Sequence, residues 1–74
     1  MPVHFSLVLR GYDREQVDAV SARAMTAIEA GTPAERSEMA AELSSTQFRM
    51  VMRGYMPEQV DAHVTVLLQE LRQA

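Results

Sequence analysis

The chain has 74 residues, enough for one small domain with a thin core, because folding at this length buries only about 60% of the surface that the unfolded chain exposes. It contains no cysteine, which excludes a disulfide framework and a thiolate metal site and favours a reducing compartment, the cytoplasm. Seven Lys and Arg against ten Asp and Glu, a net charge of -3, argue against nucleic-acid binding, which needs clustered basic residues.

The apolar runs are short. The longest of them, such as residues 64–68, fall far short of the roughly 20 residues that a membrane-spanning helix needs. The N-terminal sequence MPVHFSLVLR lacks the basic start and hydrophobic run of a signal peptide. We therefore expect a chain that neither spans a membrane nor is exported, and peripheral contact with the inner face of the cell membrane stays open.

Two stretches of the sequence repeat one another. The first motif, residues 5–19, reads FSLVLRGYDREQVDA, and the second motif, residues 48–62, reads FRMVMRGYMPEQVDA, with ten of the fifteen positions identical. Such self-similarity is the signature of a duplicated structural unit. We predict a single domain over residues 1–74, with repeat 1 at about 4–31, a connector helix at about 33–44 and repeat 2 at about 47–74.

Each motif begins with a short extended segment. Apolar residues alternate on one side of both segments: Phe5, Leu7 and Leu9 in the first, and Phe48, Met50 and Met52 in the second. Segments this brief do not form a stable sheet alone, so we expect the two to pair with each other or to lie across the helices. Gly11 and Gly54 then permit a sharp turn that a side chain would oppose.

A long helix is predicted after each turn. In the first, Asp13 is a good N-cap with Gln16 at position N3, a capping-box-like arrangement, and the helix runs over residues 14–30 until Gly31 stops it. In the second, Pro57 occupies the first helical position. The predicted apolar faces are Val17, Val20, Ala24, Ala27 and Ile28 in the first helix, and Val60, Val64, Leu67, Leu68 and Leu71 in the second.

A third helix is predicted between the motifs, because Thr32, Pro33 and Glu35 form a capping signal, and it ends near residue 43. The first helix spans about 25 Å, the connector returns about 16 Å, and the extended residues 44–47 add about 13 Å. The chain can therefore return to its starting level. The predicted fold is mostly α, a pseudo-twofold tandem repeat of extended segment, Arg-Gly-Tyr turn and long helix, with the long helices parallel and the connector antiparallel.

Phe5, Arg10-Gly11-Tyr12 and Glu15 to Ala19 of the first motif recur in the second motif as Phe48, Arg53-Gly54-Tyr55 and Glu58 to Ala62. This combination of residues resembles the N-terminal motif of DivIVA, the bacterial pole and septum protein, and of its relative GpsB. In that family two chains form a parallel helical dimer. Its crossed loops carry an apolar residue and an adjacent Arg that contact the membrane, or its groove binds partner peptides. By motif position, the resemblance implies these loop roles for Leu9, Arg10, Met52 and Arg53.

The other motif residues are interpreted as structural: Gly11, Tyr12, Asp18, Gly54, Tyr55 and Asp61. Tyr12 and Tyr55 are expected to act as hydrophobic staples on the helix starts. Arg10 and Arg53 have two interpretations. They could contact phosphate head groups, or they could be structural, as an ion pair with Asp18 or Asp61 or as a cap on the neighbouring copy.

We expect no enzymatic activity, because the sequence lacks a Gly-rich phosphate loop, a nucleophile elbow and paired catalytic histidines. We also expect no cofactor, no metal, no small-molecule substrate and no nucleic acid. The resemblance implies a module of bacterial cell division or polar growth that acts as a membrane-associated or scaffold-type factor. The alternative is a soluble adaptor that binds partner peptides or helices without membrane contact. A protein partner, a second copy included, is expected in both cases, and Val66 on the outer helix face hints at such association.

Overall fold

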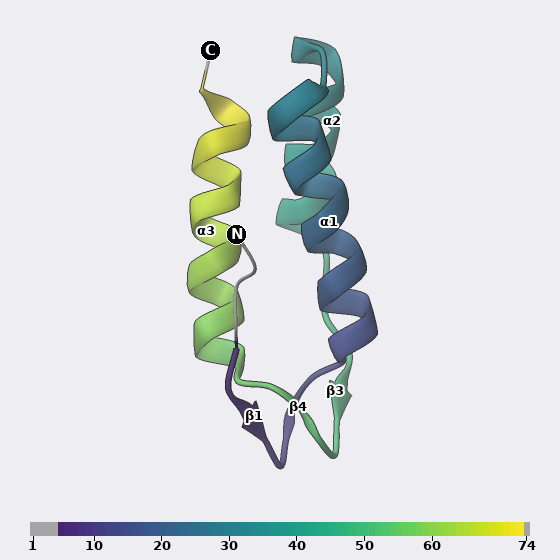
Figure 1. Ribbon diagram of the computed structural model, residues 1–74, viewed down its shortest axis with the longest axis vertical. Helices are drawn as coiled ribbons and strands as arrows, with labels where there is room; N and C mark the ends of the chain where they lie inside the picture. The colour runs from purple at the N-terminus through teal and green to yellow at the C-terminus, as the bar shows by residue number, and fades with distance from the viewer. Residues whose placement is uncertain (1–4, 74) are drawn as a thin grey trace.

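The protein is mostly helical, with a small antiparallel sheet at one end (Figure 1). The computed structural model describes residues 5–73, so the outer ends of the two predicted repeats, residues 4 and 74, lie outside the described residues. Along the described chain the elements are β1 (Leu7–Val8), β2 (Gly11–Tyr12), α1 (Arg14–Ala30), α2 (Pro33–Ser45), β3 (Met50–Val51), β4 (Gly54–Tyr55) and α3 (Pro57–Arg72).

The helices begin where local capping signals predict. α1 follows Asp13, whose carboxylate accepts a hydrogen bond from the Glu15 amide at 3.0 Å, and α1 ends before Gly31, which confirms its predicted bounds. α2 starts at a complete capping box, in which the Glu35 amide donates to Thr32 Oγ1 at 3.2 Å and the Thr32 amide donates to Glu35 Oε1 at 2.9 Å. Such a cap contributes about 1 kcal/mol, because it satisfies backbone donors that the first helical turn leaves without partners.

All three helices of the described chain contribute to one thin core. The buried hydrophobic residues are Val17, Val20 and Ala24 of α1, Met39, Ala40 and Leu43 of α2, and Val60, Leu67 and Leu71 of α3. The interpretation of α2 as a connector understates its role, because α2 packs against both other helices and supplies an equal share of buried residues. Burying one aliphatic side chain stabilises a fold by about 1.5 to 3 kcal/mol, so α2 is needed for a sufficient core.

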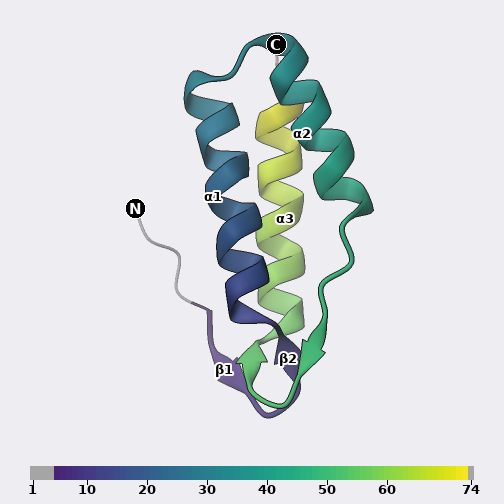
Figure 2. The same ribbon diagram turned by 90° about the vertical axis from the view of Figure 1, so that its right-hand side faces the viewer.

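The sheet joins the two motifs by exchanging their strands. Its order is β1-β4-β2-β3, with β1 antiparallel to β4 and β2 antiparallel to β3. The central strands β2 and β4 meet where Tyr12 pairs with Tyr55. The sequence predicts that the extended segments pair with each other or lie across the helices. In the structure β1 and β3 lie at opposite edges of the sheet, and each pairs with the second strand of the other motif (Figure 2).

The helices are tied to this sheet at their starts. α1 follows β2 and α3 follows β4 after one intervening residue each, so both begin at the sheet end of the molecule (Figure 1). α2 runs back toward the sheet and delivers the chain to β3 (Figures 1 and 2). The loops between β1 and β2 and between β3 and β4 therefore project together from one end.

Gly11 and Gly54 allow two backbone segments to approach each other closely and do not form a turn, which corrects the sequence prediction. Both lie inside strands, neither has a positive φ, and the bends fall earlier, at residues 9–10 and 52–53. A Cβ atom on Gly11 would lie 2.5 Å from the carbonyl carbon of Gly54, and one on Gly54 would lie 2.7 Å from that of Gly11. The two backbones cross so closely that neither position has room for a side chain.

Candidate functional site

The bends of the two loops form the candidate site, and we call them the loop tips: Leu9 with Arg10, and Met52 with Arg53. Leu9 is 78% exposed and Met52 is 82% exposed, the highest values among the large hydrophobic residues described. Both arginines are exposed as well. Since the two loops project from the same end (Figures 1 and 2), the bends at residues 9–10 and 52–53 lie at one end of the molecule.

A shallow hollow connects the tips across the motif boundary. Arg10 of the first motif lines it together with Met50, Val51 and Met52 of the second motif, and its volume is about 240 Å³. Met50 and Leu7, at equivalent positions of the two loops, are also exposed, so the apolar surface extends beyond the bends. An apolar surface beside guanidinium groups can accept a ligand that has both apolar and anionic parts.

Neither tip arginine forms an ion pair within residues 5–73, so the structural pair with Asp18 or Asp61, one of the alternatives for Arg10 and Arg53, is not observed. These two carboxylates bind tyrosines instead. The Tyr12 hydroxyl donates to Asp61 Oδ1 at 3.1 Å, and the Tyr55 hydroxyl donates to Asp18 Oδ1 at 2.9 Å. Each tyrosine thus binds the carboxylate of the other motif.

The tyrosine rings have a role that the sequence did not predict. Instead of acting only within its own motif, Tyr12 packs on Phe48 with ring centroids 5.1 Å apart, and Tyr55 packs on Phe5 at 5.0 Å. Partial burial raises the pKa of both tyrosines, and the neighbouring carboxylate raises it further because the protonated hydroxyl is the donor. The two phenols are therefore held protonated as links between the motifs.

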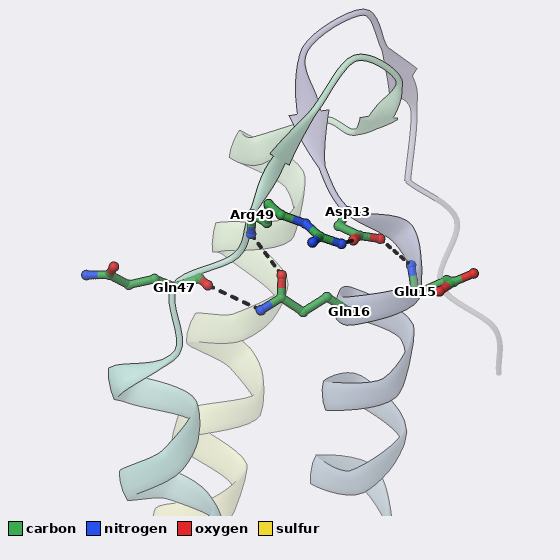
Figure 3. Close-up of polar contacts among 5 residues, drawn as sticks. All are labelled: Asp13, Glu15, Gln16, Gln47 and Arg49. Atoms are coloured by element: carbon green, nitrogen blue, oxygen red, sulfur yellow. Dashed lines mark hydrogen bonds and ion pairs between the residues drawn. The ribbon is translucent and has the colours of Figure 1, made fainter.

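Two glutamine side chains form hydrogen bonds with backbone groups of the other half of the chain. Gln16 Oε1 accepts from the Arg49 amide at 2.8 Å, and Gln16 Nε2 donates to the Gln47 carbonyl at 3.2 Å (Figure 3). Gln59, its counterpart, accepts from the Ser6 amide at 2.6 Å. The prediction that Gln16 completes a capping box on its own helix is wrong. Glutamine occupies the same position in both motifs, and this repetition could have indicated a shared structural role.

An ion pair between Asp13 and Arg49 distinguishes the two halves (Figure 3). The guanidinium lowers the pKa of Asp13, and the carboxylate raises the pKa of Arg49. The equivalent positions hold Met56 and Ser6, which form no charge pair. The charge of Arg49 is therefore compensated within the protein, whereas Arg10 and Arg53 remain available at the tips.

His63 of α3 packs against Phe5, with the rings edge-on and their centroids 5.5 Å apart. Burial lowers the pKa of His63, and Glu70 opposes that shift only in part. The imidazole is thus a neutral packing group of α3, away from the loop tips.

Within residues 5–73 no three His, Cys, Asp or Glu side chains gather closely enough to hold a metal ion. No described helix combines the length and the apolar character that crossing a membrane requires. Comparison of the whole chain with protein-family models, curated proteins and solved structures finds no match.

Proposed function

We propose that the protein is a non-catalytic DivIVA-like module of bacterial cell division or polar growth, and that its loop tips attach it peripherally to the inner face of the cell membrane. The observation that carries this proposal is the exposure of Leu9 and Met52 beside Arg10 and Arg53, which form no ion pair in the described chain. Large apolar side chains that cost free energy in water mark surfaces that bind a partner or a membrane.

The chemistry of the tips suits a lipid interface. An apolar side chain can enter the acyl boundary while the adjacent guanidinium stays with the lipid phosphates. Each basic residue near an anionic membrane contributes about 1 kcal/mol, which is weak alone and useful in a pair. Half of the ten acidic residues, Glu29, Glu35, Glu38, Glu42 and Glu70, lie in helices away from the sheet end, so their charge is distant from a membrane that the tips contact.

The proposal includes a tandem architecture, in which one chain builds the pair that the resembling family makes from two chains. Reciprocal contacts support it: the Asp13 amide donates to the Arg49 carbonyl at 2.9 Å, and the equivalent Met56 amide donates to the Ser6 carbonyl at 2.8 Å. In this view α1 and α3 form the parallel pair, related by a pseudo-twofold axis through the sheet. Two tips on one rigid end would then engage a surface together, which strengthens binding without self-association.

A soluble adaptor is the second candidate function, and one observation favours it. A groove of about 360 Å³ lies beside the sheet, and its lining includes the apolar residues Phe48, Val64 and Leu68 together with the carboxylate of Asp61. Such a groove suits a peptide or helix that carries apolar and basic residues. Adaptor binding there would not require the loop tips.

Co-sedimentation with vesicles tests the membrane proposal. The double variant Leu9→Asp with Met52→Asp should lose binding to vesicles of phosphatidylglycerol and phosphatidylethanolamine, and the parent should bind neutral phosphatidylcholine vesicles weakly. The matched control is Ala62→Asp with Val66→Asp, which adds the same two charges at exposed positions of α3. This control should bind like the parent, and circular dichroism should show helices in all three proteins.

Two outcomes would contradict the membrane proposal. Vesicle binding that survives in the folded tip variant would show that the tips are not the contact. Loss of binding in both double variants would show a general effect of charge. Retention of a protein partner by a tip variant that no longer binds vesicles would support an additional adaptor role for the groove.

A further inference from the structure

The two loop tips differ chemically in a consistent way. The first loop carries Leu7 and Leu9, whereas the second carries Met50 and Met52 at the equivalent positions. Both pairs are exposed to a similar degree, 47% for Leu7 against 46% for Met50. Leu and Met have nearly the same volume and both are apolar. The chemical difference between the two loops is therefore a thioether in the second where the first has a branched alkyl group.

A thioether can be modified, and a branched alkyl group resists the same reagent. With hydrogen peroxide, the sulfur lone pair attacks one peroxide oxygen, the O–O bond breaks, and a proton transfer releases water and leaves a sulfoxide. The sulfur is oxidised by two electrons and the peroxide is reduced to water. The product side chain is polar and loses its affinity for apolar surroundings.

Among the described methionines, Met50 and Met52 are the exposed ones. Met52 has the highest exposed fraction among the large hydrophobic residues described, and Met50, in the adjoining strand β3, is exposed as well. Met39 is buried in the core, and Met25 and Met56 are half-buried. Because susceptibility follows access to the oxidant, Met52 is expected to react first and Met39 last.

We propose that Met52, with Met50 beside it, is an oxidation site whose reversible conversion to the sulfoxide switches the second tip from apolar to polar. This inference rests on the proposed membrane function and adds a form of regulation to it. Arg10 lines the same hollow as both methionines, so a sulfoxide oxygen there is an acceptor for its guanidinium. Oxidation would thus remove an apolar anchor and also engage an arginine that otherwise meets lipid phosphates.

The apolar anchor of the first tip keeps its character, since Leu9 has no thioether to oxidise. Oxidised protein would hold the membrane through one apolar tip instead of two. Because burial of one Met side chain is worth about 1.5 to 3 kcal/mol, its loss corresponds to binding that is weaker by at least about tenfold. The switch therefore weakens attachment in a graded manner without unfolding the helices.

The test begins with a time course of hydrogen peroxide treatment, followed by peptide mass spectrometry. Met52 should gain an oxygen atom before Met25 and Met56, and Met39 should react last. Oxidised parent protein should bind anionic vesicles at least about tenfold more weakly, and a methionine sulfoxide reductase with a dithiol should restore binding. The dithiol is oxidised to a disulfide as the sulfoxide oxygen leaves as water.

Two double variants distinguish the effect of oxidising Met50 and Met52 from the effect of oxidising the other methionines. Met50→Leu with Met52→Leu makes the second tip equal to the first, so it should bind vesicles like the parent and be insensitive to peroxide. Met25→Leu with Met56→Leu keeps the tip thioethers and should stay sensitive. Each sample needs a circular dichroism spectrum to show that oxidation leaves the helices intact.

The failures are distinguishable. Oxidation of Met25 or Met39 before Met52 contradicts the assignment of Met52 as the oxidation site, and this conclusion does not depend on the vesicle-binding result. Selective oxidation of Met52 with unchanged vesicle binding overturns the switch. Absence of vesicle binding by the reduced parent overturns the proposed membrane function and the switch that depends on it, whereas the order of oxidation still decides the site.

Discussion

The hydroxyl of Tyr12 donates a hydrogen bond to Oδ1 of Asp61 at 3.1 Å, which links two residues that are 49 positions apart in the chain. The reciprocal bond runs from Tyr55 to Asp18 at 2.9 Å. Each tyrosine sits in the central pair of strands and each aspartate in the first turns of a helix. These two bonds therefore join the sheet to the starts of α1 and α3 in a crosswise manner.

The crosswise bonds predict a specific coupling. A double-mutant cycle of Tyr12→Phe and Asp61→Asn should give a coupling energy of about 0.5 to 1.5 kcal/mol, the net contribution of a hydrogen bond at a partly exposed position. The cycle of Tyr55→Phe and Asp18→Asn should give a similar value. The mixed cycle of Tyr12→Phe and Asp18→Asn is the control and should be additive. Chemical denaturation measures all three, and equal coupling in the mixed cycle would refute the partner assignment.

The close crossing of the strands predicts a severe effect of a single methyl group. Gly54→Ala places a Cβ against the backbone of Gly11 and Tyr12, with the nearest carbons at 2.7 Å and 2.8 Å, so the free energy of unfolding should fall by at least about 3 kcal/mol. The exposed Leu9→Ala in the adjacent bend should change it by less than about 0.5 kcal/mol. Thermal and urea unfolding compare the two. Parent-like stability of Gly54→Ala would show that the crossing is looser than described.

Neighbouring positions of α3 predict opposite sensitivities. Leu67 is buried in the core, so Leu67→Ala should destabilise the protein by about 2 to 5 kcal/mol through lost burial and a residual cavity. Val66 is 49% exposed on the outer face, so Val66→Ala should cost less than about 0.5 kcal/mol. Urea denaturation followed by circular dichroism measures both. Similar losses at both sites would mean that the helix faces are assigned wrongly or that a second copy covers Val66.

His63 predicts a pH dependence of stability near neutrality. Its pKa in the folded protein is lowered below the value of about 6.5 that the unfolded chain has, so the unfolded state binds the proton more readily. The free energy of unfolding should therefore be level above about pH 7.5 and should decrease as the pH falls through about 6.5. His63→Gln should give a flat profile in this range.

A second decline at lower pH is expected in both proteins. The pKa values of Asp13 and Glu35 are lowered in the folded state, so their contribution is present above their ordinary values near 4 and is lost as the pH falls further. The window between about pH 7.5 and 5.5 thus isolates the histidine. A decline there that persists in His63→Gln would assign the effect to another group.

Local physics made several features predictable from the sequence. The start of α1 at Asp13 and of α2 at Thr32 depends on side chains that cap the nearest backbone amides, and the end of α1 depends on the adjacent Gly31. The buried faces of α1 and α3 follow from apolar spacing along each helix. The exposure of Leu9 and Met52 was not predictable in this way, because the sequence pattern placed both in extended segments and only the family resemblance implied a contact role for them.

The amino-acid sequence by itself thus determined the helices, their apolar faces and the repeated motif, because these depend on contacts within a few residues. Only the tertiary structure decided which motif each strand, glutamine and tyrosine binds, as Gln16 on Arg49 and Tyr12 on Asp61 show. The two motifs share their tyrosines, glutamines and aspartates, so each offers the same partners within and between copies, and the local pattern cannot choose between them. The choice follows from the backbone crossing at Gly11 and Gly54, which exists only once the helices have brought the two loops to one end.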